Sequence, residues 1–72
     1  MEKGTVVYFN VKKGYGFISW SINNKKQKDM FVHYSDIDMN GFKLLNIDQK
    51  VEFEIGVNLK GDPKAVKVKV IS

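Results

Sequence analysis

The sequence predicts an all-β fold in which five short antiparallel strands close into a small barrel. Five segments are rich in strand-forming residues, glycine-containing or polar stretches separate them, and no run of ten or more residues has a helical period. Strands this short cannot hide their edges in a flat sheet, whereas a closed barrel pairs every one of them. The chain of 72 residues is expected to form a single domain over 1–72.

The first three strands are expected at residues 4–10, 15–20 and 30–34. The first is a run of β-branched and aromatic residues, and a turn that ends at Gly14 follows it. The second has the same character, and the polar stretch after it, residues 23–28, is expected to be a loop. The third strand is followed by a short turn, which Ser35 is expected to cap.

The last two strands are expected at residues 49–57 and 65–71, on either side of a turn at 60–63. Both alternate between apolar and charged residues, and successive strand side chains point to opposite faces of a sheet. Residues 38–48 contain only isolated apolar side chains and are expected to form an ordered loop. The apolar residues predicted to point inward from the last two strands are Val51, Phe53, Ile55, Val66, Val68 and Val70.

Composition excludes several classes of site. The chain has no cysteine and one histidine, so we expect no disulfide, no metal site and no cofactor. No catalytic arrangement is evident, and we predict that the protein is not an enzyme and has no small-molecule substrate. No stretch approaches the ~20 apolar residues of a membrane span, and the first residues lead directly into a strand. A cytoplasmic protein with no membrane partner is therefore expected.

The charge balance favours a polyanionic partner. The net charge is +4 and all 12 basic residues are lysines. Guanine edges in a DNA duplex are commonly read by arginine, which binds them with two hydrogen bonds, and this chain has no arginine. The composition therefore disfavours sequence-specific binding to a duplex.

Aromatic side chains share one face of the second and third strands. If the core takes Ile18, Met30 and Val32, alternation turns the opposite faces outward. A contiguous exposed patch of rings requires a reason, and rings flanked by cations are what proteins use to stack single-stranded bases. The residues predicted to form this outward patch are Tyr15, Phe17, Phe31 and His33, with Lys12 and Lys13 beside them.

Two alternatives stay open at this point. Alternation alone also allows the inverse assignment, in which these rings form the core. A barrel could also bind a saccharide or a protein partner through the same aromatic face, although such binding would gain nothing from the lysines. Salt dependence separates the two kinds of ligand, because phosphate binding weakens as counterions compete.

Two motifs resemble those of the cold-shock domain family. Residues 13–18, K-G-Y-G-F-I, are similar to its first RNA-binding motif, and residues 30–34, M-F-V-H-Y, are similar to its second. The resemblance covers nearly the whole chain. It implies an oligonucleotide-binding (OB) barrel that binds single-stranded RNA and DNA as an RNA chaperone. Transcription antitermination, translation regulation and a stress response are further roles that it allows, and a monomer is expected.

The resemblance also implies roles for individual residues. Lys13 would contact phosphate, and Asn10 and Asp29 would form hydrogen bonds with base edges. Tyr8 stands where tryptophan is usual, and the lysines of the long 19–28 stretch either extend the positive surface or form a solvated loop. Trp20, just before this loop, is expected at the edge of the core. The base-stacking residues implied by position are Tyr8, Tyr15, Phe17, Phe31, His33, Tyr34 and Phe42, and the lysines of the long stretch are Lys25, Lys26 and Lys28.

Overall fold

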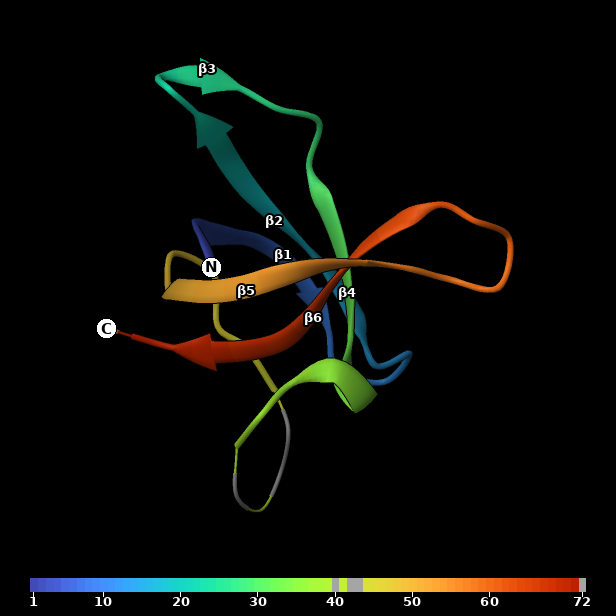
Figure 1. Cartoon of the computed structure of the whole chain (residues 1–72). Helices are drawn as coiled ribbons and strands as arrows, with labels where there is room; N and C mark the ends of the chain where they lie inside the picture. The colour runs from blue at the N-terminus through green and yellow to red at the C-terminus, as the bar shows by residue number, and fades with distance from the viewer. Residues whose placement is uncertain (40, 42–43, 72) are drawn as a thin grey trace.

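The computed structural model describes residues 1–39, 41 and 44–71 (Figure 1). Six strands and one turn of 3₁₀ helix follow the predicted order, and no α-helix occurs in this part of the chain. The elements are β1 (Glu2–Asn10), β2 (Tyr15–Ile22), β3 (Lys25–Lys26), β4 (Met30–His33), η1 (Tyr34–Asp36), β5 (Lys50–Val57) and β6 (Pro63–Val70).

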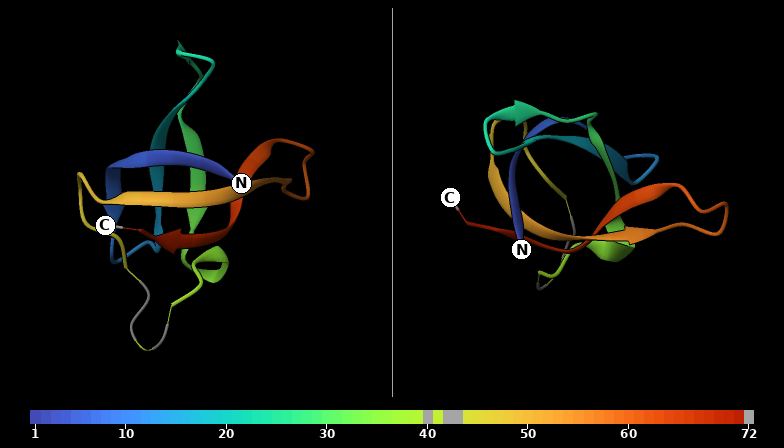
Figure 2. Two further views of the ribbon diagram at one scale, coloured as in Figure 1. Left: turned by 60° about the vertical axis from the view of Figure 1, so that its left-hand side comes forward. Right: turned by 45° about the horizontal axis from the view of Figure 1, so that its top comes forward.

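The five long strands close into a barrel, which confirms the predicted fold class. The order in the sheet is β1-β5-β6-β4-β2-β3, and an additional pairing of β1 with β2 closes the ring (Figure 2). All pairs are antiparallel except β4 with β6, which run parallel at Phe31 and Lys64. Each long strand therefore has a partner on both sides, and β3 alone forms a short projecting edge.

The predicted loop over 23–28 was wrong at residues 25 and 26, which form β3. Strand β2 continues to Ile22 and folds back through Asn23 and Asn24 into β3, so that Ile22 pairs with Lys25. The two asparagines have φ values of 50° and 66°, the left-handed conformation that tight hairpin turns require. Asparagine adopts this conformation more readily than other non-glycine residues, and the Asn-Asn pair was the signal for the turn. The result is a short arm that projects from the barrel (Figure 1).

The predicted end of the third strand was also wrong. Strand β4 ends at His33, and Tyr34 is the first residue of η1. The cap of this turn is His33 instead of Ser35, because the Ser35 backbone N–H donates to His33 Nδ1 at 3.3 Å. A histidine ring nitrogen can accept such a bond as a serine hydroxyl does, but the residue preferences for caps favour serine.

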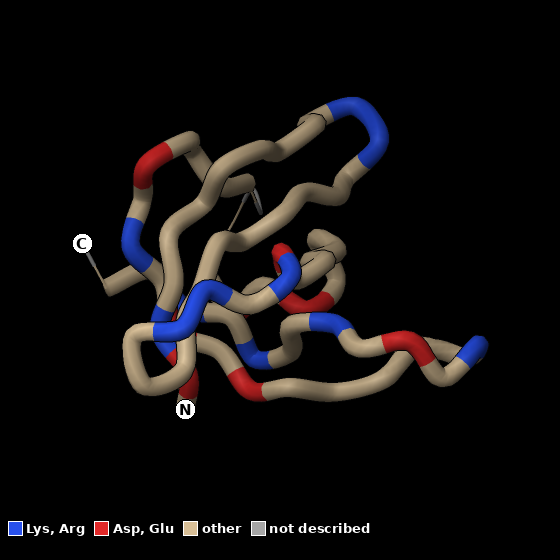
Figure 3. The backbone as a smooth tube through the Cα atoms, turned by 90° about the horizontal axis from the view of Figure 1, so that it is seen from above, with Lys and Arg blue, Asp and Glu red and all other residues tan. Residues whose placement is uncertain are grey.

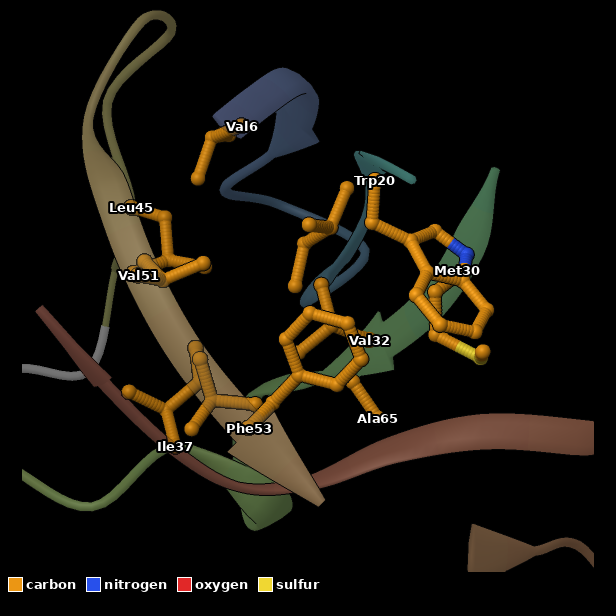
Figure 4. Packing of buried hydrophobic residues seen from close by; sticks show 11 residues of the cluster. Val6, Trp20, Met30, Val32, Ile37, Leu45, Val51, Phe53 and Ala65 are labelled. Carbon is orange, nitrogen blue, oxygen red and sulfur yellow. The ribbon is translucent and has the colours of Figure 1, made fainter. Parts of the chain in front are cut away.

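The core lies inside the barrel, and Phe53 is its largest fully buried side chain (Figure 4). The predicted inward residues Ile18, Met30 and Val32 are buried, as is Trp20 at 8% exposure. The Trp20 ring packs edge-on against Phe53, with centroids 5.7 Å apart. The buried hydrophobic residues of the described chain are Val6, Ile18, Trp20, Met30, Val32, Ile37, Leu45, Val51, Phe53, Ala65 and Val68.

Two of the predicted core positions were wrong. A bulge in β6 lets Glu54 pair with Val66 and Glu52 with Lys69, and Lys67 within it has a φ of 52°. Because a bulge resets the alternation, Ala65 is buried and Val66 is only half-buried. Ile55 is 49% exposed, where β5 and β6 extend beyond the barrel as a hairpin (Figure 1).

Candidate nucleic-acid interface

Strands β2 and β4 place the predicted aromatic side chains side by side. Tyr15 pairs with His33 and Phe17 pairs with Phe31, and all four side chains are half-buried. Gly16, between the two β2 rings, faces inward, where a Cβ would collide with the Tyr8 carbonyl and the Phe9 ring. The backbones of β1 and β2 therefore approach closely behind the rings, which gives the rings a rigid support.

The rings of Tyr8, Tyr15, Phe17 and Phe31, here called the aromatic cluster, are in mutual contact. Tyr15 and Phe31 are stacked, with centroids 5.7 Å apart and planes at 27°. Phe17 and Phe31 meet edge-to-face at 6.0 Å. Tyr8 lies 6.3 Å from Tyr15 and 6.2 Å from Phe17. These separations fall in the range of favourable aromatic pairs, and the cluster is a continuous apolar surface.

A bulge at Val7 brings Tyr8 into this cluster. Strict alternation from buried Val6 would turn Tyr8 into the core. The pairing instead steps from Val6–Ile18 to Tyr8–Phe17, which leaves Val7 unpaired and 42% exposed. Tyr8 consequently shares the face of Phe17 and is 41% exposed. The bulge explains why Tyr8 lies among the stacking residues, which only the family resemblance had indicated.

His33 and Tyr34 extend the aromatic surface beyond the cluster. Their ring centroids are 4.5 Å apart, and Tyr34 is 49% exposed because it has left the strand for η1. The Ser35 hydroxyl lies 2.8 Å from His33 Nδ1, and since that nitrogen accepts the Ser35 N–H, the hydroxyl donates as well. The His33 ring is thus held in one orientation.

Two polar residues implied as base contacts are partly engaged within the protein. Asn10 Oδ1 accepts the Lys13 backbone N–H at 2.9 Å, and its amide donates to the Tyr8 hydroxyl at 3.2 Å. Asp29 Oδ1 accepts a hydrogen bond from Lys26 Nζ at 2.8 Å in an exposed ion pair. Each therefore retains only part of its hydrogen-bonding capacity for a ligand.

Lysines gather at two places outside the core. Lys12 and Lys13 occupy the β1–β2 turn, whereas Lys25 and Lys26 form β3 in the arm and Lys28 follows it (Figure 3). Within the described residues Lys26 pairs with Asp29, whereas the other four form no ion pair. Three lysines of β6 are neutralised, because they pair with Asp36, Glu54 and Asp38.

Comparison with known proteins places these observations in a family. The model of the 'Cold-shock' DNA-binding domain matches residues 2–71. The chain belongs to this family. It is 45% identical to a cold shock protein of Arthrobacter globiformis over 71 residues, which cover 99% of this chain and all of that protein. A cold shock-like protein of Thermotoga maritima is 49% identical over 69 residues, with 96% of this chain and 97% of that protein covered.

Membership confirms that this cold-shock domain is a nucleic-acid-binding module and not an enzyme. In the part of the chain that the structure describes, no group of three or more potential ligands could hold a metal ion. No helix within the same residues is long and apolar enough to cross a membrane. Phe42, which the resemblance implied as a stacking residue, lies outside the described residues.

The cold-shock domain also has a groove that the sequence did not indicate. It lies beside Phe17 and Phe31, between residues 27–29 and the β5–β6 hairpin, and has a volume of about 640 Å³. Trp20, whose Nε1 donates to the Lys28 carbonyl at 2.9 Å, forms part of its wall. The sequence predicted only a turn at residues 60–63. Nothing in its pattern indicated that this turn lies near residues 27–29.

Gly14→Ala is expected to destabilise the domain by about 1–2 kcal/mol, because Gly14 has a φ of 75°. The new Cβ would also lie 2.6 Å from the Tyr34 ring, so this ring must move. Urea unfolding measures the first effect and NMR shifts of the Tyr34 and His33 rings measure the second.

Gly61→Ala is the matched control, since Gly61 has a φ of 86° and no heavy atom near the added Cβ. It should lower stability comparably and leave both ring signals in place. Equal displacement of these signals in the two variants would contradict the role assigned to Gly14.

Proposed function

We propose that this cold-shock domain binds single-stranded RNA and DNA by stacking bases on the aromatic cluster and on His33 and Tyr34. One observation carries the proposal: Tyr8, Tyr15, Phe17 and Phe31 form a continuous aromatic surface on the outside of a barrel whose core is filled by other residues. Each stacked base contributes about 1–3 kcal/mol, with little dependence on its identity. Phe42 belongs to the proposed surface on the strength of the family resemblance.

The lysines supply the phosphate contacts in this proposal. Lys12 and Lys13 flank the aromatic cluster at one turn, and Lys25 and Lys28 form no ion pair among the described residues. A lysine contacts phosphate as a point charge, so these contacts add affinity without selecting a sequence. Asn10 and Asp29 contribute their remaining hydrogen-bonding groups to base edges.

The domain would act as an RNA chaperone without an energy source. A strand of roughly half a dozen nucleotides fits one barrel of this kind, for which sites of about 4–16 are usual. Because stacking needs unpaired bases, binding shifts an RNA hairpin toward its melted state by mass action. Antitermination of transcription and control of translation are two outcomes of such melting.

The remaining expectations are part of the same proposal. Residues 1–72 would form one domain that functions as a monomer in the cytoplasm, with no small-molecule substrate. Pairing of all five long strands on both sides supports the monomer, because an unpaired strand edge is the usual template for association.

The salt dependence of binding tests the proposal. Fluorescence anisotropy compares labelled oligo-dT, oligo-U, a duplex and a neutral oligosaccharide at several salt concentrations. We expect tight binding of both single strands and weak binding of the duplex. Contacts with two or three phosphates predict a logarithmic salt slope of roughly −1.4 to −2.1.

The other results have distinct meanings. A markedly steeper slope would indicate that the lysines of the arm dominate binding and the rings contribute little. Binding of the oligosaccharide, with no dependence on salt, would replace nucleic acid by a sugar ligand. If neither nucleic acid nor the oligosaccharide binds, the proposal is overturned. A protein partner then remains as the ligand of the aromatic face.

A further inference from the structure

The groove beside the aromatic cluster is suited to a flat, partly apolar ligand. Phe17 and Phe31 form part of both the cluster and the groove, so the two surfaces are continuous. Ile55 and Pro63, from the β5–β6 hairpin, add apolar surface on the other side. The volume of about 640 Å³ lies within the ~300–1,000 Å³ that small-ligand sites usually occupy.

Two carboxylates line the groove, together with the Lys28 ammonium group and the amides of Gln27 and Asn58. Asp62 comes from the hairpin and Asp29 from the segment that follows the arm. Asn58 Oδ1 accepts the backbone N–H groups of Lys60 and Asp62, both at 2.9 Å, which orders the end of the hairpin. The Asp62 carboxylate itself makes no hydrogen bond or ion pair with any described residue.

The two carboxylates favour a base with N–H donors. Carboxylates repel phosphate, whereas a carboxylate accepts two parallel N–H bonds from one ligand. The Watson–Crick edge of guanine carries two adjacent N–H groups. Thymine and uracil present a single N–H between two carbonyl oxygens, which a carboxylate repels.

We propose that the groove binds one nucleobase of the stacked strand and selects guanine through the carboxylates of Asp62 and Asp29. The inference rests on the proposed function, because the base must arrive as part of a bound single strand. It adds a sequence preference at one position to a surface that stacks every base alike.

The test uses thymidine heptamers in which a single guanine occupies each position in turn. Anisotropy titrations give the affinity of each heptamer relative to the all-thymine strand. At one position guanine should bind about tenfold more tightly, since a good bidentate contact discriminates by roughly that factor. O6-methylguanine, which lacks the ring N–H, should lose this advantage at the same position.

Substitutions in the groove should remove the preference for guanine, whatever their effect on the binding of the all-thymine strand. Asp62→Asn and Asp29→Asn each replace an acceptor by a group that also presents donors, and at least one should abolish the advantage of guanine. Asp48→Asn is the matched control, because Asp48 lies outside the groove and its φ of 75° suits asparagine. For each variant, the preference is the ratio of its affinities for the guanine-containing and the all-thymine heptamers. A uniform effect of the lost charge cancels in this ratio.

The possible outcomes separate the inference from the proposed function. If no position prefers guanine while the all-thymine strand still binds, the groove inference is overturned and the proposed function stands. If Asp48→Asn removes the preference as fully as the groove variants, the carboxylates are not the selective groups. If none of the heptamers binds, the proposed function itself fails.

Discussion

Replacing Phe31 by alanine is expected to weaken the binding of a single-stranded heptanucleotide by about 1–3 kcal/mol, or roughly 5- to 150-fold. Phe31 stacks with Tyr15 and meets Phe17 edge-to-face. Its loss therefore removes one stacking platform and also frees its neighbours to move. Because the Phe31 side chain is only half-buried and outside the core, the free energy of unfolding should change far less than for a core residue.

Two measurements on each variant decide this prediction. Anisotropy with labelled oligo-dT gives the affinity, and urea unfolding followed by circular dichroism gives the stability. Phe17→Ala should behave in the same way. Ile71→Ala removes an apolar side chain that is 46% exposed and distant in the sequence from the cluster, and should leave affinity unchanged. A strongly destabilised Phe31→Ala variant with intact binding would assign the rings to the core.

Phe53→Ala is expected to have the largest effect on stability. Phe53 is fully buried at the centre of the barrel, in contact with Trp20, and a buried Phe→Ala change costs about 3–5 kcal/mol. A domain of 72 residues has a total stability of only about 4–11 kcal/mol. The variant should therefore unfold at much lower urea concentration or temperature, and binding should be lost together with the fold.

Phe53→Leu provides the control, because it keeps most of the buried volume. It should remain folded at low temperature and bind oligo-dT with nearly unchanged affinity. Weakened binding by a folded Phe53→Leu variant, to the degree expected for Phe31→Ala, would show that Phe53 contributes directly to the ligand site. A Phe53→Ala variant as stable as the parent would contradict its place in the core.

Local pattern was sufficient for the strands that carry the aromatic cluster. Phe17 and Phe31 alternate with small or aliphatic residues that a barrel core accepts, so period-two alternation alone predicts their common face. The side chains of Ile18 and Val32 are indeed fully buried. These predictions succeeded because β2 and β4 pair in regular register at this point.

Alternation does not predict side-chain direction where a strand contains a bulge or leaves the barrel. The bulges at Val7 and Lys67 each shift the alternation by one residue, which turns Tyr8 outward and exchanges Val66 for Ala65 in the core. Ile55 continues the apolar pattern of β5 but lies on the projecting hairpin. A bulge depends on the partner strand, and its position does not follow from the composition of the bulged strand alone.

The all-β fold, the family and the two motifs whose rings meet on β2 and β4 could be predicted before the structure was known. These follow from side-chain period and turn residues, which act over a few positions of the chain. The structure was needed to explain why Tyr8 lies in the aromatic cluster and to show that Asp62 lies across a groove from residues 27–29. Both depend on how strands distant in the sequence pair and where hairpins project, and local periodicity contains no information on either.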